Sequence, residues 1–245
     1  HPMINLLFPT KGGDMMQSLV HKYEQGGWLP IFPCWNSYTA AMIGDHCISA
    51  ISDAYCKGIR NFDVDKAYEG MRKNAFETPS NLDEYKNGMG RRALTSYLEY
   101  GYIPLEDGVP DAFHTKEQVS RTLEYAYDDW CIYQMAKALN RPKKELKLFA
   151  DRAMNYKNVF DKESLLMRGR NKDGQFQAPF SPLKWGDAFT EGNSWHYSWS
   201  VFHDPQGLID LMGGEKVFVE MLDSVFIVPP LFDDSYYGQV IHEIR

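Results

Sequence analysis

The sequence predicts an all-α protein. Apolar residues recur at helical spacing along most of the chain, and glycine or proline follows most of these segments as a stop signal. No stretch between turn signals alternates apolar and polar residues over a length that requires a sheet. The expected helices also come in pairs, one carrying acids and aromatics among its apolar residues and the next plainly amphipathic.

Taken in order, the expected helices begin with segment 14–25, whose methionine, leucine, valine and tyrosine side chains fall on one face. Gly26 and Gly27 end it, because glycine accepts the left-handed conformation of a helix C-terminus. By the same criteria the remaining helices are expected at 39–57, 63 or 65–76, 91–100, 117–139, 143–159, 194–201, 206–212 and 215–225, with another start at 242–244.

Three long irregular segments rich in aromatic residues precede the helices that carry internal acids: 27–38, 101–116 and 160–193. A long loop inside a compact domain is usually functional or disordered, and the aromatic residues argue against disorder. We therefore expect these segments to lie against a pocket or a core.

The composition makes several classes of function less favoured. Hydrophobic residues make up 44% of the 245 residues, which indicates a globular protein. The net charge of −7 disfavours a nucleic-acid surface, and no apolar run approaches the roughly 18–20 residues that span a membrane. The 4 cysteines lack C-x-x-C spacing, which disfavours a zinc or redox motif and favours buried free thiols.

The densest group of functional residue types is segment 185–199, which combines aromatic rings with two carboxylates and a histidine. Sugar faces stack on rings, and sugar hydroxyls require many hydrogen-bond partners. Glu191 lies between Phe189 and Trp195 in this segment. Desolvation there would favour its protonated form, which a general acid needs, whereas a helix start would favour the carboxylate. An aromatic core helix is the alternative reading.

A second group of candidates lies on two expected helices. Asp45 and His46 follow the aromatic loop that contains Trp35, so they are candidates to bind sugar hydroxyls; ordinary helix polar positions are the alternative.

On the helix at 117–139, Glu124, Asp128 and Asp129 sit among apolar residues. Such clustering indicates either a site or a salt-bridge network, with Arg121 as the expected counter-ion. Further on, Asp204 precedes a proline and reads as a helix N-cap, while the role of His203 stays open.

Several motifs in order resemble glycoside hydrolase family 92. They are Cys34-Trp35, Met42-Ile43-Gly44-Asp45-His46, Lys57-Gly58-Ile59-Arg60, Thr122-Leu123-Glu124-Tyr125-Ala126-Tyr127-Asp128-Asp129-Trp130, Glu191-Gly192-Asn193-Ser194-Trp195-His196-Tyr197-Ser198-Trp199, His203-Asp204 and Gly207-Leu208-Ile209-Asp210-Leu211-Met212-Gly213-Gly214. The resemblance implies a mostly bacterial, calcium-dependent, inverting exo-α-mannosidase whose catalytic domain is an (α/α)6 toroid. The paired helices expected above fit that architecture.

The resemblance also assigns roles. It implies that Glu191 is the proton donor and that the substrate is a mannose-containing oligosaccharide. The substrate-binding candidates are Trp35, Asp45, His46, Glu124, Asp128, Asp129, Trp195 and His203. Calcium is expected to bridge the sugar's O2 and O3, but its ligands and the general base are expected mostly outside this chain, so no metal ligand is assigned here.

The same resemblance sets the domain organisation. Residues 1–245 would form the central part of the barrel, with an N-terminal β-sandwich domain and the C-terminal part of the barrel outside this chain. The rest of the parent protein is thus the expected partner, and the expected location is extracytoplasmic, in the periplasm or at the cell surface.

Two other functions compete with this reading. Another toroid-type glycosidase or polysaccharide lyase would keep the fold, but a lyase needs a positively charged cleft, and basic residues are scarce near the aromatic loops. A non-catalytic sugar-binding or structural fragment would keep the aromatic residues without a catalytic pair.

Overall fold

The computed structural model describes residues 2–109 and 115–228. The chain divides into two compact units, and each is described by itself. The described part of unit 1 comprises residues 2–95, 109 and 124–154, and that of unit 2 comprises residues 96–108, 115–123 and 155–228.

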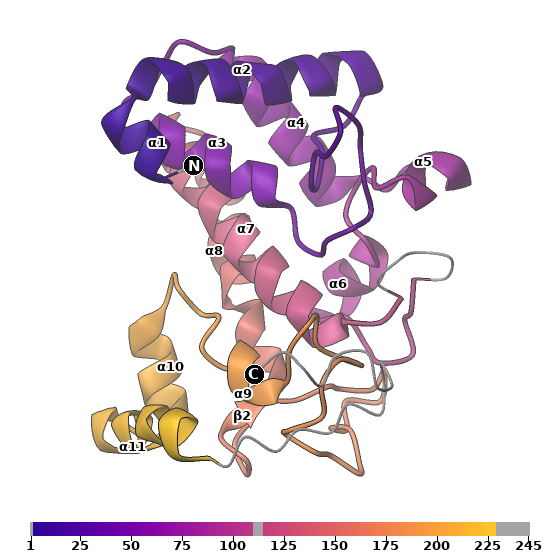
Figure 1. Cartoon of the computed structure of the whole chain (residues 1–245), viewed down its shortest axis with the longest axis vertical. Helices are drawn as coiled ribbons and strands as arrows, with labels where there is room; N and C mark the ends of the chain where they lie inside the picture. Colours follow the sequence, from indigo (N-terminus) through magenta and orange to yellow (C-terminus); the bar gives the residue numbers. More distant parts are fainter. Residues whose placement is uncertain (1, 110–114, 229–245) are drawn as a thin grey trace. The chain divides into compact units, whose positions relative to one another are not determined.

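Unit 1 is a group of packed helices. Its elements are α1 (Pro2–Leu7), α2 (Pro9–Gly26), α3 (His46–Cys56), α4 (Val64–Phe76), α5 (Leu82–Lys86), the larger part of α7 (Gln118–Ala138) and α8 (Lys143–Ala153). The long helix α2 contacts α1, α3 and α4, as Figure 1 shows. Side chains such as Val20, Ile51, Met71, Ile132 and Phe149 from these helices are fully buried in a common core.

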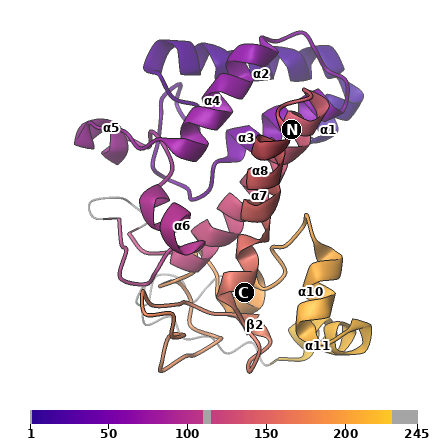
Figure 2. The ribbon, with the colours of Figure 1, turned by 180° about the vertical axis from the view of Figure 1, so that it is seen from behind.

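Unit 2 has shorter elements and longer loops. It contains most of α6 (Leu94–Tyr100), nearly all of the 3-10 helix η1 (Met154–Val159), the strands β1 (Phe160–Asp161) and β2 (Leu166–Met167), and the helices α9 (Ser194–Tyr197), α10 (Pro205–Met212) and α11 (Glu215–Ile227). The strands pair antiparallel, with Phe160 opposite Met167. Helices α10 and α11 pack against each other (Figure 2).

The all-α prediction is confirmed, since the sheet found in the described residues has two strands of two residues each. Two helix starts were predicted too early. The helix expected from residue 39 begins at His46, because Gly44 takes a left-handed conformation with φ of 80° and Asp45 is the N-cap. The helix expected from residue 91 begins at Leu94, after Ala93 with φ of 51°.

Smaller differences between prediction and structure concern the ends of helices and the burial of the cysteines. In the helix expected at 143–159, the last six residues, Met154–Val159, are 3-10. The start expected at 242–244 lies outside the described residues. All 4 cysteines are free; Cys47 and Cys131 are buried as predicted, but Cys56 is exposed. Among the described residues, no helix has the length and apolar character needed to cross a membrane.

Candidate active site

Glu191 lies in a closed loop of unit 2, residues 186–192. The amide of Gly186 donates to the carbonyl of Gly192 at 2.8 Å and so joins the loop ends. Two non-glycine residues in it are left-handed, Asp187 with φ of 59° and Glu191 with φ of 45°. That conformation is disfavoured for residues with a Cβ and recurs at functional sites, so the surroundings must hold this loop in place.

The start of α7 supplies part of that support. The amide of Glu117 donates to the Asp187 carbonyl at 2.8 Å, and the amides of Val119 and Ser120 donate to the Ala188 carbonyl at 3.0 and 3.3 Å. In return, the Ser120 hydroxyl accepts from the amide of Thr190 at 2.9 Å. Amides at a helix start have no partner inside the helix, so the loop satisfies them while the helix fixes the loop.

Two lysines hold the Asp187 side chain. Its carboxylate accepts from Lys116 Nζ at 2.8 Å and from Lys184 Nζ at 2.9 Å. Burial alone would raise the pKa of Asp187, but the hydrogen bonds from Lys116 and Lys184 outweigh it and lower the pKa. The carboxylate therefore stays ionised and keeps the loop tied to both lysines.

The structure presents Glu191 differently from the prediction. The residue is exposed, and its carboxylate makes no hydrogen bond or ion pair with the described residues. Desolvation between Phe189 and Trp195 was expected, but Phe189 is buried in the unit and Trp195 is half-buried. Nor is Glu191 at a helix start, because α9 begins at Ser194 with Asn193 as its N-cap. The loop thus offers Glu191 to solvent.

His196 is a polar residue of this segment that the sequence did not single out. Its ring nitrogen Nδ1 lies 3.2 Å from the backbone amide of Asn193, whose side chain in turn caps the His196 amide at 3.2 Å. The ring meets Trp185 edge-on, with centroids 5.3 Å apart. Burial lowers the pKa of His196, which favours the neutral imidazole. The three-residue spacing of Asn193 and His196, which occupy the N-cap and N3 positions of α9, could have indicated this pairing from the sequence.

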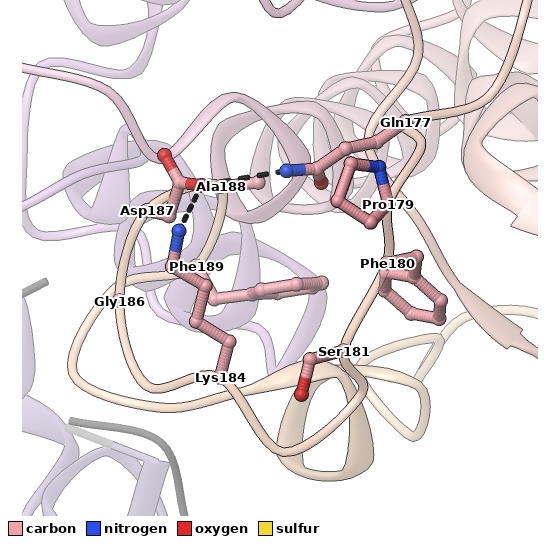
Figure 3. Close-up of a pocket in the computed structure, with 9 residues that line it drawn as sticks. All are labelled: Gln177, Pro179, Phe180, Ser181, Lys184, Gly186, Asp187, Ala188 and Phe189. Atoms are coloured by element: carbon pink, nitrogen blue, oxygen red, sulfur yellow. Dashed lines mark hydrogen bonds and ion pairs between the residues drawn. The ribbon is translucent and has the colours of Figure 1, made fainter. Parts of the chain in front are cut away.

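A pocket of about 250 Å³ adjoins the Glu191 loop in the same unit. Figure 3 shows its nine lining residues, with the Phe189 ring reaching into the space that they surround. The lining consists of Gln177, Pro179, Phe180, Ser181, Lys184, Gly186, Asp187, Ala188 and Phe189. Gly186 and Asp187 therefore belong both to the pocket wall and to the loop that carries Glu191.

His203 lies at the start of another helix of unit 2. The carboxylate of Asp204 accepts from the amide of Gly207 at 3.0 Å, which confirms the predicted N-cap. The Tyr156 hydroxyl donates to the same carboxylate at 2.7 Å, and the Tyr156 ring meets His203 edge-on at 5.6 Å. A sugar-binding role for His203 remains a prediction.

In unit 1, the predicted acids form a buried ion-pair network. Arg91 donates from Nε to Asp45 at 3.1 Å and from Nη1 to Asp129 at 2.8 Å. Arg152 Nε donates to the other oxygen of Asp129 at 2.7 Å, and the Asn74 amide donates to Asp45 at 3.1 Å. The side chains of Asp45, Arg91 and Asp129 have 0% exposure. Asp45 and Asp129 are thus committed to protein groups rather than presented to a ligand.

The counter-ion predicted for this cluster was wrong. Arg121 pairs with Glu117 at 3.5 Å, and both side chains are buried. The arginines that neutralise Asp129 come from elsewhere in the chain, 38 and 23 residues away.

Asp128 has no such partner. Its residue exposure is 1%, and neither carboxylate oxygen has a hydrogen-bond partner among the described residues. Burial, and then the nearby charge of Asp45, raise the pKa of Asp128 well above its usual range. Both effects favour the protonated, uncharged form of this side chain in the core of unit 1.

The remaining candidates of unit 1 reach its surface. His46 Nδ1 lies 3.6 Å from Glu124, and their side chains are 40% and 24% exposed. Trp35 is 89% exposed. It forms the tip of a tight turn with Asn36, at φ of 50° and 56°, and Cys34 and Ser37 exchange backbone hydrogen bonds across it.

Comparison with known proteins decides the family. Residues 1–243 match the glycosyl hydrolase family 92 catalytic domain. The chain belongs to this family. The resemblance seen in its sequence motifs is thereby confirmed.

Solved family 92 enzymes share the fold of this chain. An inverting mannosidase of Bacteroides thetaiotaomicron is 35% identical, with a TM-score of 0.82, and the match covers 100% of this chain and 31% of that enzyme. An α-mannosidase of the same bacterium, solved with mannoimidazole, is 34% identical over 96% of this chain and 29% of its own, with a TM-score of 0.82.

A relative from another organism matches as well. A protein of Arthroderma benhamiae described as an uncharacterized secreted glycosidase is 31% identical, over 86% of this chain and 30% of its own length. This family 92 chain therefore spans about 30% of the length of the relatives it matches.

Calcium, expected from the family, requires several oxygen ligands. Across residues 2–109 and 115–228, no group of three or more His, Cys, Asp or Glu side chains is placed to hold a metal ion. The buried carboxylates of Asp45 and Asp129 are already taken by arginines. No calcium ligand is therefore assigned among the described residues, and the expectation that the ligands lie mostly outside this chain stays a prediction.

Proposed function

We propose that the parent protein of this chain hydrolyses terminal α-linked mannose from mannan or N-glycan oligosaccharides, with inversion, and that Glu191 is its general acid. The observation that carries this proposal is the exposed carboxyl of Glu191 on a left-handed residue, in a loop tied to α7 and to two lysines. Family membership supports glycoside hydrolysis, and the similarity to two solved mannosidases supports mannose as the sugar.

In this mechanism, the Glu191 carboxyl donates its proton to the glycosidic oxygen as the bond from that oxygen to the anomeric carbon breaks. A water activated by a second carboxylate attacks the opposite face of the sugar, so the configuration inverts. The two carboxyls of an inverting enzyme lie roughly 6.5–9.5 Å apart, which leaves room for that water. We assign the base to the part of the parent protein outside this chain.

The other candidates divide by exposure. Trp35 and Trp195 have ring surface available for stacking on a sugar, and His46 and Glu124 have polar atoms at the surface of unit 1. Asp45, Asp128 and Asp129 are buried, so we assign them to holding the fold rather than to touching the sugar. We further propose that the parent protein acts outside the cytoplasm, as the name of the fungal relative says of that protein.

The test is Glu191→Gln in the longest natural protein that contains this chain. Glutamine keeps the shape and removes the donatable proton. Hydrolysis of an α-linked mannobiose, whose leaving group is a poor alkoxide, should slow by roughly 10²–10⁴-fold. A dinitrophenyl α-mannoside needs little protonation and should lose far less. Glu163→Gln, at another exposed acid of unit 2, is the matched control and should leave both rates unchanged.

The outcomes separate the alternatives. Equal losses on both substrates would assign Glu191 to binding or folding. Full activity of the variant on mannobiose would remove it from the mechanism. A wild-type protein that binds mannosides without hydrolysing them would favour the non-catalytic sugar-binding module.

Calcium dependence is tested separately, by dialysis against EGTA and re-addition of calcium. We expect activity of the wild-type parent protein to be lost and restored. The residual activity of Glu191→Gln should show the same dependence, because an acid that donates a proton is not expected to be a metal ligand. Activity that survives complete chelation would contradict the proposed calcium requirement.

A further inference from the structure

A second pocket of unit 2 gathers positive charge, although the chain as a whole has a net charge of −7. Its volume of about 530 Å³ lies within the roughly 300–1,000 Å³ of small-molecule sites, and none of residues 186–192 lines it. In the sequence, basic residues are scarce near the aromatic segments, but the fold brings four of them to this pocket. The charged lining residues are Lys157, Lys162, Arg168 and Arg170, with the acids Asp161 and Glu163.

A short hairpin, residues 168–177, places two of these cations beside an aromatic ring. Backbone hydrogen bonds join residues 169–171 to residues 175–177, and Arg170 stands opposite Phe176. Residues two apart in an extended segment point to the same side, so Arg168 shares the face of Arg170. Their guanidinium carbons lie 5.9 and 5.2 Å from the centre of the Phe176 ring, within cation–π range. The ring therefore contacts both guanidinium groups.

The two arginines differ in what neutralises them. Arg168 Nη1 donates to the Asp161 carboxylate at 2.9 Å. Burial would raise the pKa of Asp161, but its hydrogen bonds, with that from Arg168 the largest, outweigh burial and lower the pKa, so this pair stays ionised. Arg170 instead donates to the backbone carbonyls of Gly174 and Asn158, at 2.7 and 3.1 Å, and forms no ion pair with the described residues. These carbonyls fix the guanidinium of Arg170 without cancelling its charge.

The remaining charges of the lining leave this positive excess in place. Lys162 is exposed and forms no ion pair with any residue that the structure describes. Lys157 Nζ reaches Asp204 only at 3.9 Å. Glu163 is the opposing charge, but it is exposed on the turn between β1 and β2, where water solvates its carboxylate. A concave site with an excess of one sign of charge attracts ligands of the other sign.

The donors of Arg170 select the kind of anion. Neither of the two carbonyls takes a hydrogen from Nη2, so part of the planar fork is left for the oxygens of a carboxylate or a phosphate. Lys162 can add a second cation from the rim. We propose that this pocket binds the phosphate or carboxylate group of a small anionic ligand, with Arg170 and Lys162 as its charged contacts. This site goes beyond the proposed function and does not rest on the role of Glu191.

Titration calorimetry of the longest natural protein that contains this chain tests the site. Inorganic phosphate and acetate are the probes, and potassium chloride at matched ionic strength is the blank. We expect saturable binding of at least one probe. Binding of phosphate alone would support a site for phosphate esters, and comparable binding of acetate would support a site for carboxylates. Saturable binding of neither probe would overturn the proposal.

Two variants assign the binding to this pocket. Arg170→Met should weaken it about tenfold or more, the scale of a lost charge-assisted hydrogen bond. Lys162→Met should weaken it about threefold, the scale of an exposed ion pair. Lys216→Met is the matched control, because it removes one charge from an exposed position of unit 2 that does not line the pocket, and it should leave binding unchanged.

The exposed variant keeps the test decisive if Arg170→Met disturbs the hairpin, since the Lys162 side chain makes no ion pair in the described fold. Equal weakening in Lys162→Met and Lys216→Met would show attraction to surface charge in general and would overturn the site. Mannoside hydrolysis does not enter these measurements. A failure of the proposed function and a failure of this oxyanion site are therefore separate results.

Discussion

The buried acids of unit 1 and Glu191 in unit 2 differ in exposure and in how they are held. In unit 1, Asp45 and Asp129 lie in or beside regular helices, have no exposure, and are bound by arginines. In unit 2, Glu191 sits on an irregular, left-handed backbone, and its own carboxylate is left exposed. The hydrogen bonds that fix its loop are made by neighbouring residues instead. The carboxylates of Asp45 and Asp129 are bound by arginines and hold the fold together. The carboxylate of Glu191 is exposed and held only through its backbone, so it is available for proton transfer.

The largest expected effects distinguish the two regions: a substitution at Glu191 should reduce activity, and one in the ion-pair network of unit 1 should reduce stability. Glu191→Gln should cost the activity given above, yet change the free energy of unfolding by less than about 0.5 kcal/mol, as exposed substitutions usually do. Calorimetry of the parent protein checks this. A large fall in melting temperature would show that the carboxyl of Glu191 also has a structural role.

Arg91→Met should do the reverse. It leaves Asp45 and Asp129 buried with one counter-charge fewer, which costs about 3–5 kcal/mol of unfolding free energy. Chemical denaturation or melting temperature measures it. Arg72→Met is the matched control: Arg72 makes a half-exposed ion pair with Glu145 at 2.9 Å, worth at most about 1 kcal/mol. Equal losses of unfolding free energy in Arg91→Met and Arg72→Met would contradict a special structural role for the buried network.

An intermediate effect is expected for Asp187→Asn. Asparagine tolerates the left-handed backbone, but it replaces two charge-assisted hydrogen bonds with weaker ones. The Glu191 loop should then be less well positioned, and kcat on mannobiose should fall roughly tenfold, less than for a full misplacement of the acid. KM should stay near wild type. A raised KM with unchanged kcat would place Asp187 in substrate binding instead.

The smallest effect concerns pH. Asp128 holds its proton to higher pH in the folded than in the unfolded state, so its contribution to stability is fully present below the unfolded pKa of about 4 and declines as pH rises above it. Asp128→Asn removes that decline. The melting temperature of the variant relative to wild type should therefore increase between pH 4 and pH 8.

Helix content was predictable because periodicity is a local property. The helices expected at 63 or 65–76 and 117–139 appear as Val64–Phe76 and Gln118–Ala138. The start of α3 was predicted too early, at residue 39, because the prediction did not take account of Gly44 and Asp45, a left-handed glycine followed by an N-cap.

The counter-ions of the acid network were not predictable in the same way. Arg91 and Arg152 reach Asp129 only through tertiary packing, and arginine is seldom fully buried, so the sequence-near Arg121 was the natural but wrong choice. For Glu191, the aromatic neighbours suggested burial. Exposure depends on a backbone turn and on bonds to residues 117–120, about which side-chain composition says nothing.

The bonds between the Glu191 loop and the start of α7 give the molecule a built-in reporter. The amides of Val119 and Ser120 are protected from hydrogen exchange only while the Ala188 carbonyl, nearly 70 positions away, is in place. Their exchange rates therefore measure how often the loop opens, even in a sample that turns over no substrate. The same dependence limits protein engineering, because a graft that alters residues 186–190 would also fray the first turn of the longest helix.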